Sequence, residues 1–180
     1  MLLVVDNGSI YTKQLTDFLS EKNISFEKYT PYILELNSLQ KYDSIILSGR
    51  RKNDKKINEV NSKIINFSIK NKKKLLGICY GAEILALTLG GTIRKTQSIQ
   101  KGPENVEILK DNLITKNSIN VFESHAFEIS KLPNMLTIIG KSNNCKYEII
   151  KHKENLIFGT QFHPEMTPDG NNLIENFCSL

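Results

Sequence analysis

The sequence predicts an α/β fold: a mostly parallel open sheet with helices on both faces and antiparallel additions in the second half. In the first half, short apolar runs alternate with segments whose apolar residues recur at helical spacing. The apolar runs are continuous, as expected for strands buried on both faces. In the second half, short strand-like runs follow one another with turns between them and little helix. These observations together define the fold class.

The expected elements of the first half follow in order along the chain. Ile57, Val60, Ile64, Ile65 and Ile69 form one helical face, and Gly90-Gly91 ends the last of these helices as a C-cap. The order is strand Leu2–Val5, helix Ile10–Leu19, strand Ser25–Tyr29, strand Ser44–Leu47, helix Ile57–Ile69, strand Leu75–Cys79 and helix Ala82–Leu89.

The second half is expected to extend the sheet and to end in a helix. Residues 168–180 place Leu173, Ile174 and Phe177 on one helical face. No repeat or linker separates the halves, so we expect a single domain over residues 1–180. The expected strands are Val106–Leu109, Ile119–Phe122, Leu136–Gly140, Lys146–His152 and Leu156–Phe162.

Composition excludes several classes of protein. The three cysteines (Cys79, Cys145 and Cys178) lack the spacing of a disulfide framework or a metal site, so we expect a reducing compartment and no metal. No apolar stretch is long enough for a signal peptide core or a membrane span, and we expect a cytoplasmic protein without membrane association. The net charge of +5 reflects a general richness in lysine. No aromatic residues interleave with the basic runs, so we expect no nucleic-acid binding.

The segment Gly77-Ile78-Cys79-Tyr80-Gly81 is typical of a nucleophile elbow, because it lies between an apolar strand and a helix. Flanking glycines allow the sharp turn that exposes a nucleophile at a strand end. The N-terminus of the following helix would lower the pKa of the Cys79 thiol. A lone cysteine after an apolar strand is more often a small core residue, but the two glycines favour the catalytic interpretation.

A thiol nucleophile needs a base, and the segment Gln161-Phe162-His163-Pro164-Glu165 supplies one at the end of the last expected strand. Residues two apart in an extended segment point the same way, so Glu165 can orient the His163 ring. This pattern predicts a Cys79, His163 and Glu165 triad at the carboxyl edge of the sheet. His152, Cys145 and Cys178 have no partners at catalytic spacing, and we expect packing or surface roles for them.

These motifs closely resemble those of class I glutamine amidotransferases over nearly the whole chain and in the same order. The opening Asp6-Asn7-Gly8-Ser9-Ile10-Tyr11-Thr12 and the Glu123-Ser124-His125 segment are most similar to the GMP synthase branch of that family. The resemblance implies a flavodoxin-like fold and hydrolysis of glutamine through a glutamyl thioester on Cys79, with His163 protonating the departing ammonia. It also implies an oxyanion hole from backbone N–H groups of Tyr80 and of the Gly49-Arg50 turn, and a substrate wall made by Glu83, Ser124, His125, Ala126 and Phe127.

Two positions depart from the family pattern. The turn that the family writes Ser-Gly-Gly-Pro is Ser48-Gly49-Arg50-Arg51 here, and Glu83 stands where many members have glutamine. Arg50 makes a peptide flip at that position costlier by about 1 kcal/mol. Glu83 could pair with the α-ammonium of glutamine but would repel its α-carboxylate. We therefore expect low glutaminase activity in the free chain, with a partner ordering the site.

The resemblance implies that the protein partner is an ATP-pyrophosphatase synthetase subunit, which would aminate xanthosine 5′-phosphate. No cofactor is expected on this chain, since ATP and Mg²⁺ would bind to the partner, and no fused synthase domain is expected. Alternatives remain open: the glutaminase subunit of anthranilate or aminodeoxychorismate synthase, a stand-alone γ-glutamyl hydrolase, or a non-catalytic regulatory protein, against which the intact triad argues.

Overall fold

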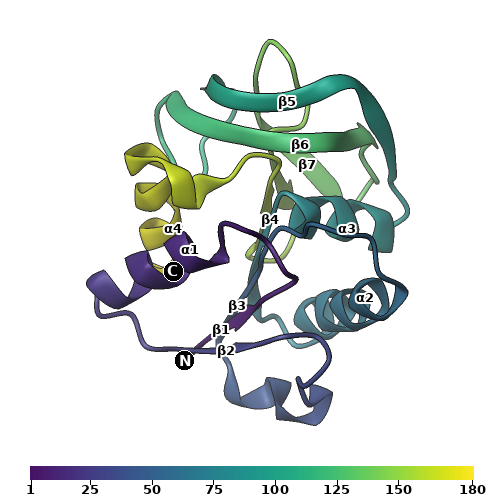
Figure 1. Cartoon of the computed structure of the whole chain (residues 1–180), viewed down its shortest axis with the longest axis vertical. Helices are drawn as coiled ribbons and strands as arrows, with labels where there is room; N and C mark the ends of the chain where they lie inside the picture. Colours follow the sequence, from purple (N-terminus) through teal and green to yellow (C-terminus); the bar gives the residue numbers. More distant parts are fainter.

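The computed structural model describes residues 1–180 and arranges nine strands in one sheet, in the order β2-β1-β3-β4-β9-β8-β7-β5-β6 (Figure 1). Five neighbouring strands are parallel to one another, and the pairs from β9 to β6 are antiparallel. This is the predicted fold class. The elements are β1 (Leu2–Val5), α1 (Thr12–Glu21), β2 (Phe26–Tyr29), η1 (Leu36–Lys41), β3 (Ser44–Leu47), α2 (Lys55–Lys70), β4 (Lys74–Ile78), α3 (Tyr80–Thr88), β5 (Thr92–Ile108), β6 (Ile119–Lys131), β7 (Leu136–Lys141), β8 (Ile149–His152), β9 (Ile157–Thr160), η2 (Pro164–Met166) and α4 (Pro168–Ser179).

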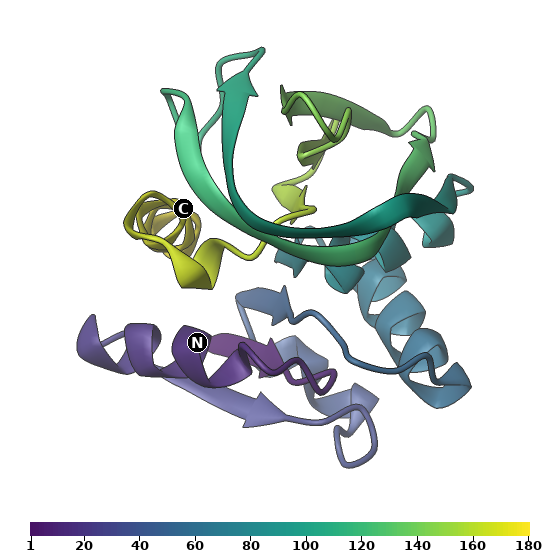
Figure 2. The ribbon, with the colours of Figure 1, turned by 45° about the horizontal axis from the view of Figure 1, so that its top comes forward.

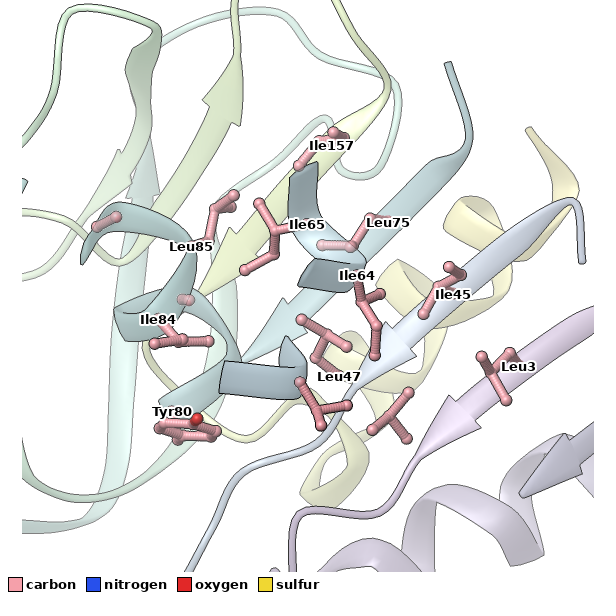
Figure 3. Packing of buried hydrophobic residues seen from close by; sticks show 14 of the residues in the cluster. Leu3, Ile45, Leu47, Ile64, Ile65, Leu75, Tyr80, Ile84, Leu85 and Ile157 are labelled. Carbon is pink, nitrogen blue, oxygen red and sulfur yellow. The ribbon is translucent and has the colours of Figure 1, made fainter. Parts of the chain in front are cut away.

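The parallel half has a hydrophobic core on each face of the sheet. Successive strand residues point to opposite faces, so Leu3 and Ile45 pack with α2 and α3, whereas Val4 and Ile46 pack with α1 and α4. Figure 3 shows the first of these cores, in which Ile64 and Ile65 of α2 lie over the sheet. The continuous apolar runs of the sequence are therefore explained by burial on both faces.

The antiparallel half differs from expectation in the length of two strands. The sequence predicted strands at Val106–Leu109 and Ile119–Phe122, but β5 and β6 run over 17 and 13 residues as a long curved ribbon (Figure 2). Most of β5 is exposed or half-buried and lacks apolar alternation. Register shifts within its pairing with β6 and a glycine at φ +133°, Gly102, interrupt the pattern further. Backbone pairing rather than burial defines this strand, which is why the residue pattern did not reveal it.

The end of α3 was predicted correctly. Gly90 has φ +93°, its N–H bonds to the Leu87 carbonyl, and the Gly91 N–H bonds to the Ala86 carbonyl at 2.8 Å. These are the two hydrogen bonds of a Schellman C-cap. None of the helices is both long enough and apolar enough to span a membrane.

The loops that follow β1, β3, β4 and β9 lie at the carboxyl edge of the parallel strands. They carry Tyr11, Gly49, Cys79 and His163 respectively. In open α/β sheets ligands bind at this edge, and β6 crosses beside it because the His163 N–H donates to the Phe122 carbonyl at 2.9 Å.

Candidate active site

Cys79 lies in a sharp turn between β4 and α3. Its backbone has φ +50° and ψ −104°, a conformation that side chains other than glycine rarely adopt. A Cβ on Gly77 would lie 2.4 Å from the Gly81 carbonyl oxygen, and one on Gly81 would lie 2.5 Å from the Leu47 carbonyl oxygen. Both flanking glycines are therefore required by close backbone approach, and the predicted elbow is confirmed.

The environment of the Cys79 sulfur differs from the sequence-based expectation. The side chain is buried, and burial is the main cause that raises the pKa of the Cys79 thiol well above its ordinary value; nearby Glu83 and Glu165 raise it further. The backbone N–H of Tyr80, at the start of α3, acts in the opposite direction. The predicted lowering of the thiol pKa is wrong because burial and carboxylates outweigh the helix N-terminus. The resting sulfur is a neutral thiol and needs a base.

His163 and Glu165 form a buried pair beyond the end of β9. His163 Nδ1 lies 2.8 Å from Glu165 Oε1, and the two side chains are 4 % and 1 % exposed. A carboxylate on Nδ1 fixes the ring with the proton on that nitrogen, which leaves Nε2 as the proton acceptor. The structure has the predicted contact between these two residues.

Other residues hold the His163 ring in place. The Tyr11 ring packs against it with centroids 4.6 Å apart, and the Tyr11 hydroxyl lies 3.1 Å from the Ser124 hydroxyl. A Cβ on Gly49 would lie 2.8 Å from His163 Cε1, so only glycine fits there. The sequence singled out Tyr11 only as part of the family motif, because nothing in the residue pattern shows that the loop after β1 reaches β9.

The Gly49-Arg50 turn is anchored on both sides. Ser48 accepts the Asn7 N–H at 2.9 Å, and its hydroxyl donates to the Gly49 carbonyl at 2.9 Å. Neither Gly49 nor Arg50 has a positive φ. The residue pattern offered no signal for the role of Asn7 beyond its place in the opening motif.

Arg50 is fixed on the first residue of α3. Its guanidinium lies 3.9 Å from the centroid of the Tyr80 ring, and Nη1 donates to Asn58 Oδ1 at 2.6 Å. The Tyr80 hydroxyl donates to the same oxygen at 2.8 Å. Asn58 on α2 could not be singled out from the sequence, because a polar residue on an amphipathic helix is indistinguishable from a solvated one. The turn is thus tied to the elbow through a side chain that the family pattern lacks.

The predicted substrate-wall residues surround the nucleophile. A hollow of about 220 Å³ is lined by Cys79 and Tyr80 together with Glu83, Ser124, His125, Ala126 and Phe127. An adjoining hollow of about 540 Å³ is lined by Tyr11 and His163 and shares Arg50 and the segment 124–126 with the first. Glu83 is buried, and its burial raises the pKa of its carboxyl group. No hydrogen bond joins Cys79 to His163, and the two line adjoining parts of one site.

Residues expected to be structural lie away from this site. His152 is buried and its Nδ1 accepts the N–H groups of Glu154 and Asn155 at 3.1 Å, so it stabilises the turn after β8. Cys145 is buried and Cys178 half-buried. No group of three or more His, Cys, Asp or Glu side chains has the arrangement of a metal site.

The fold and the site together define an α/β enzyme with a cysteine at a nucleophile elbow and a carboxylate-oriented histidine. Comparison with known proteins then identifies the family. The family described as "Glutamine amidotransferase class-I" matches residues 3–179. The chain belongs to this family of glutamine-hydrolysing enzymes.

Individual relatives give the same result. The glutamine-hydrolysing subunit of the GMP synthase of Methanocaldococcus jannaschii is 32 % identical over 187 aligned residues, covering 100 % of this chain and 97 % of the relative. A crystal structure of a putative GMP synthase subunit from Thermoplasma acidophilum superimposes with a TM-score of 0.87 at 28 % identity, covering 99 % of this chain and 92 % of the other. A glutamine amidotransferase structure from Thermotoga maritima has the same fold, with a TM-score of 0.79 at 23 % identity over 97 % of this chain and 80 % of the other.

Proposed function

We propose that this chain is the glutaminase subunit of a two-chain GMP synthase. It hydrolyses glutamine to glutamate and ammonia and delivers the ammonia to an ATP-pyrophosphatase subunit that aminates xanthosine 5′-phosphate. The observation that carries the proposal is similarity to a separate GMP synthase subunit over 100 % of this chain and 97 % of that relative. ATP and Mg²⁺ act on the partner, and this chain works without a cofactor.

Cys79 is the proposed nucleophile and His163 the proposed base. His163 Nε2 takes the thiol proton as the sulfur attacks the side-chain amide carbon of glutamine, and returns it to the departing ammonia. Glu165 stabilises the imidazolium formed in between, which is consistent with its 2.8 Å contact to Nδ1. Water, activated by the same histidine, then cleaves the glutamyl thioester.

The backbone N–H of Tyr80 and an N–H from the Gly49-Arg50 turn are the proposed donors to the tetrahedral oxyanion. Loss of one such donor typically costs about 10²–10³ in rate. Because Arg50 is held against Tyr80 and Asn58, the turn is restrained when the chain is alone. Docking of the partner would release this restraint and switch on glutamine hydrolysis.

Glu83, Ser124, His125, Ala126 and Phe127 are proposed to bind the amino-acid end of glutamine. Glu83 would face the α-ammonium group, and Arg50 or Arg51, which line the same hollow, would offset its repulsion of the α-carboxylate.

The test measures glutamate release by the purified chain alone and with a candidate ATP-pyrophosphatase subunit, ATP, Mg²⁺ and xanthosine 5′-phosphate. Partner-dependent turnover with GMP formation is expected, lost in Cys79→Ala and kept in the matched cysteine variant Cys178→Ala. Equal turnover with and without the partner would refute the proposed activation. Amination of chorismate with an anthranilate-type partner would assign the acceptor differently.

A second candidate is a stand-alone hydrolase of γ-glutamyl compounds. The observation that favours it is the buried carboxylate of Glu83 in the substrate hollow, where glutamine is common in the family. Hydrolysis of γ-glutamyl peptides by the chain alone, at a rate above that for glutamine, would support this candidate over the first.

A further inference from the structure

A second buried histidine–glutamate pair lies across the substrate hollow from the triad. Glu123 and His125 are two residues apart on β6, and both are more than nine-tenths buried. His125 Nε2 lies 2.9 Å from Glu123 Oε2 in an ion-pair contact, although its N–H direction is too bent for a good hydrogen bond. The triad mechanism gives this pair no role.

The other ring nitrogen fixes the protonation of His125. Nδ1 lies 2.8 Å from the carbonyl oxygen of Phe127. A carbonyl only accepts hydrogen bonds, so Nδ1 carries a proton and only Nε2 can titrate. With a carboxylate 2.9 Å from Nε2, the ring is held as an imidazolium with a proton on each nitrogen.

A third buried carboxyl group completes the network. Glu148, immediately before β8, is fully buried, and neither of its oxygens has a hydrogen-bond partner. Burial, followed by the charge of Glu123, raises the pKa of Glu148 to about 9. Two adjacent buried carboxyl groups cannot both be ionised at neutral pH. Glu148 therefore holds the proton, and Glu123 carries the charge that faces His125.

The network reaches the substrate hollow through Phe127. The Phe127 carbonyl also accepts an N–H from Gln161 Nε2 at 3.2 Å, and the same amide nitrogen lies 3.4 Å from Glu83 Oε1. Gln161 is fully buried, and Glu83 lines the hollow beside Cys79. A continuous set of contacts thus connects Glu148 to Glu83.

We propose that Glu123 and Glu148 are positioning residues that share one proton, keep His125 charged, and thereby hold the Phe127 carbonyl and Glu83 in place for the α-amino end of glutamine. This inference rests on the proposed assignment of the hollow as the glutamine site. It predicts that the pair controls KM for glutamine and leaves kcat nearly unchanged.

Other charged and titratable groups face His125, and the test has to separate their effects. Glu123 adjoins it on β6, and Glu83 of α3 acts on it across the hollow. Arg50, His163 and the Cys79 thiol line the same connected site. Of these, only Glu123 contacts the nitrogen that titrates.

The first measurement is an NMR titration of the imidazole nitrogens in the full chain, which contains three histidines. In the wild type, His125 is expected to stay protonated above pH 7, and in Glu123→Gln to titrate near the ordinary histidine value of about 6.5. Glu148→Gln is the matched variant, since its amide mimics the protonated acid, and it should leave the His125 titration unchanged. Identical titration of His125 in the wild type and Glu123→Gln would overturn the proposal.

The second measurement is glutaminase kinetics from pH 6 to 8, with the synthetase partner present. Glu123→Gln should raise KM for glutamine about fivefold at pH 8, because a charge-assisted hydrogen bond to the Phe127 carbonyl becomes a neutral one. At pH 6 the KM of this variant should approach the wild-type value. A fall in kcat with no change in the pH dependence of KM would show a merely structural role. The NMR result stands even if the chain does not hydrolyse glutamine, so failure of this inference and failure of the proposed function are distinguishable.

Discussion

Replacement of Glu165 by glutamine tests how the base is oriented. The amide keeps the shape of the carboxylate but carries no charge, and the site is nearly closed, with the Glu165 side chain 1 % exposed. If the amide NH₂ faces His163 Nδ1, the ring takes the other tautomer and Nε2 can no longer accept the Cys79 proton. If the amide oxygen faces Nδ1, the NH₂ replaces Glu165 Oε2, a buried atom that has no partner, and the imidazolium loses its counter-charge.

Both orientations should slow the formation of the thioester. Loss of the orienting carboxylate in triads costs about 10⁴ in kcat, or about 5 kcal/mol of transition-state stabilisation. The assay is glutamate release in the presence of the synthetase partner, with circular dichroism as the check on folding. Glu175→Gln is the matched control, since Glu175 forms a 2.8 Å surface ion pair with Lys22 and such pairs contribute little. A loss of less than about tenfold in well-folded Glu165→Gln would refute the assigned role.

Four further outcomes are expected. Gly81→Ala should lower the free energy of unfolding by about 1–3 kcal/mol and abolish activity, because its Cβ would lie 2.5 Å from the Leu47 carbonyl oxygen; urea unfolding near the wild-type midpoint would contradict this. Arg50→Gly should raise glutaminase activity of the chain alone about fivefold by removing about 1 kcal/mol of restraint at the turn, whereas exposed Arg51→Gly should not. Alkylation of Cys79 by iodoacetamide, followed by peptide mass spectrometry, should be slower at pH 7 than that of free cysteine and still be rising at pH 9, because burial raises the pKa of the thiol; a plateau near pH 7 would show a stabilised thiolate. The folded pKa of Glu148, about 9, lies above its unfolded value, so the folded state keeps a proton that the unfolded chain releases; stability should fall as pH rises from about 5 to 9, by up to about 1.4 kcal/mol per pH unit, and Glu148→Gln should flatten this fall in urea unfolding series.

The parallel half of the fold could be predicted closely from the sequence, because double burial writes a continuous apolar run at each strand. Leu2–Val5 and Ser44–Leu47 have the bounds that were expected. The β5–β6 ribbon could not be predicted in full. Its residues are mostly exposed, so cross-strand hydrogen bonds rather than an apolar pattern determine its length.

The candidate site could be predicted where chemistry depends on local spacing. The elbow at Cys79 and the His163–Glu165 pair are both local motifs, and the structure has the geometry expected of each. The contacts of Asn58 with Arg50 and of Glu148 with Glu123 join segments that the residue pattern does not connect. The expected thiolate at Cys79 failed for the same reason, since the burial and the distant carboxylates that raise its pKa are properties of the tertiary structure.

The central claim, that Cys79 attacks glutamine, is tested most directly by trapping the covalent intermediate. The chain is mixed with glutamine and its partner, quenched with acid during turnover, and analysed by intact-protein and peptide mass spectrometry. A glutamyl group on the Cys79 peptide is predicted for the wild type, and no glutamate release is predicted for Cys79→Ser. Glutamate release by Cys79→Ser at the wild-type rate, with no modified Cys79 peptide in the wild type, would contradict the account.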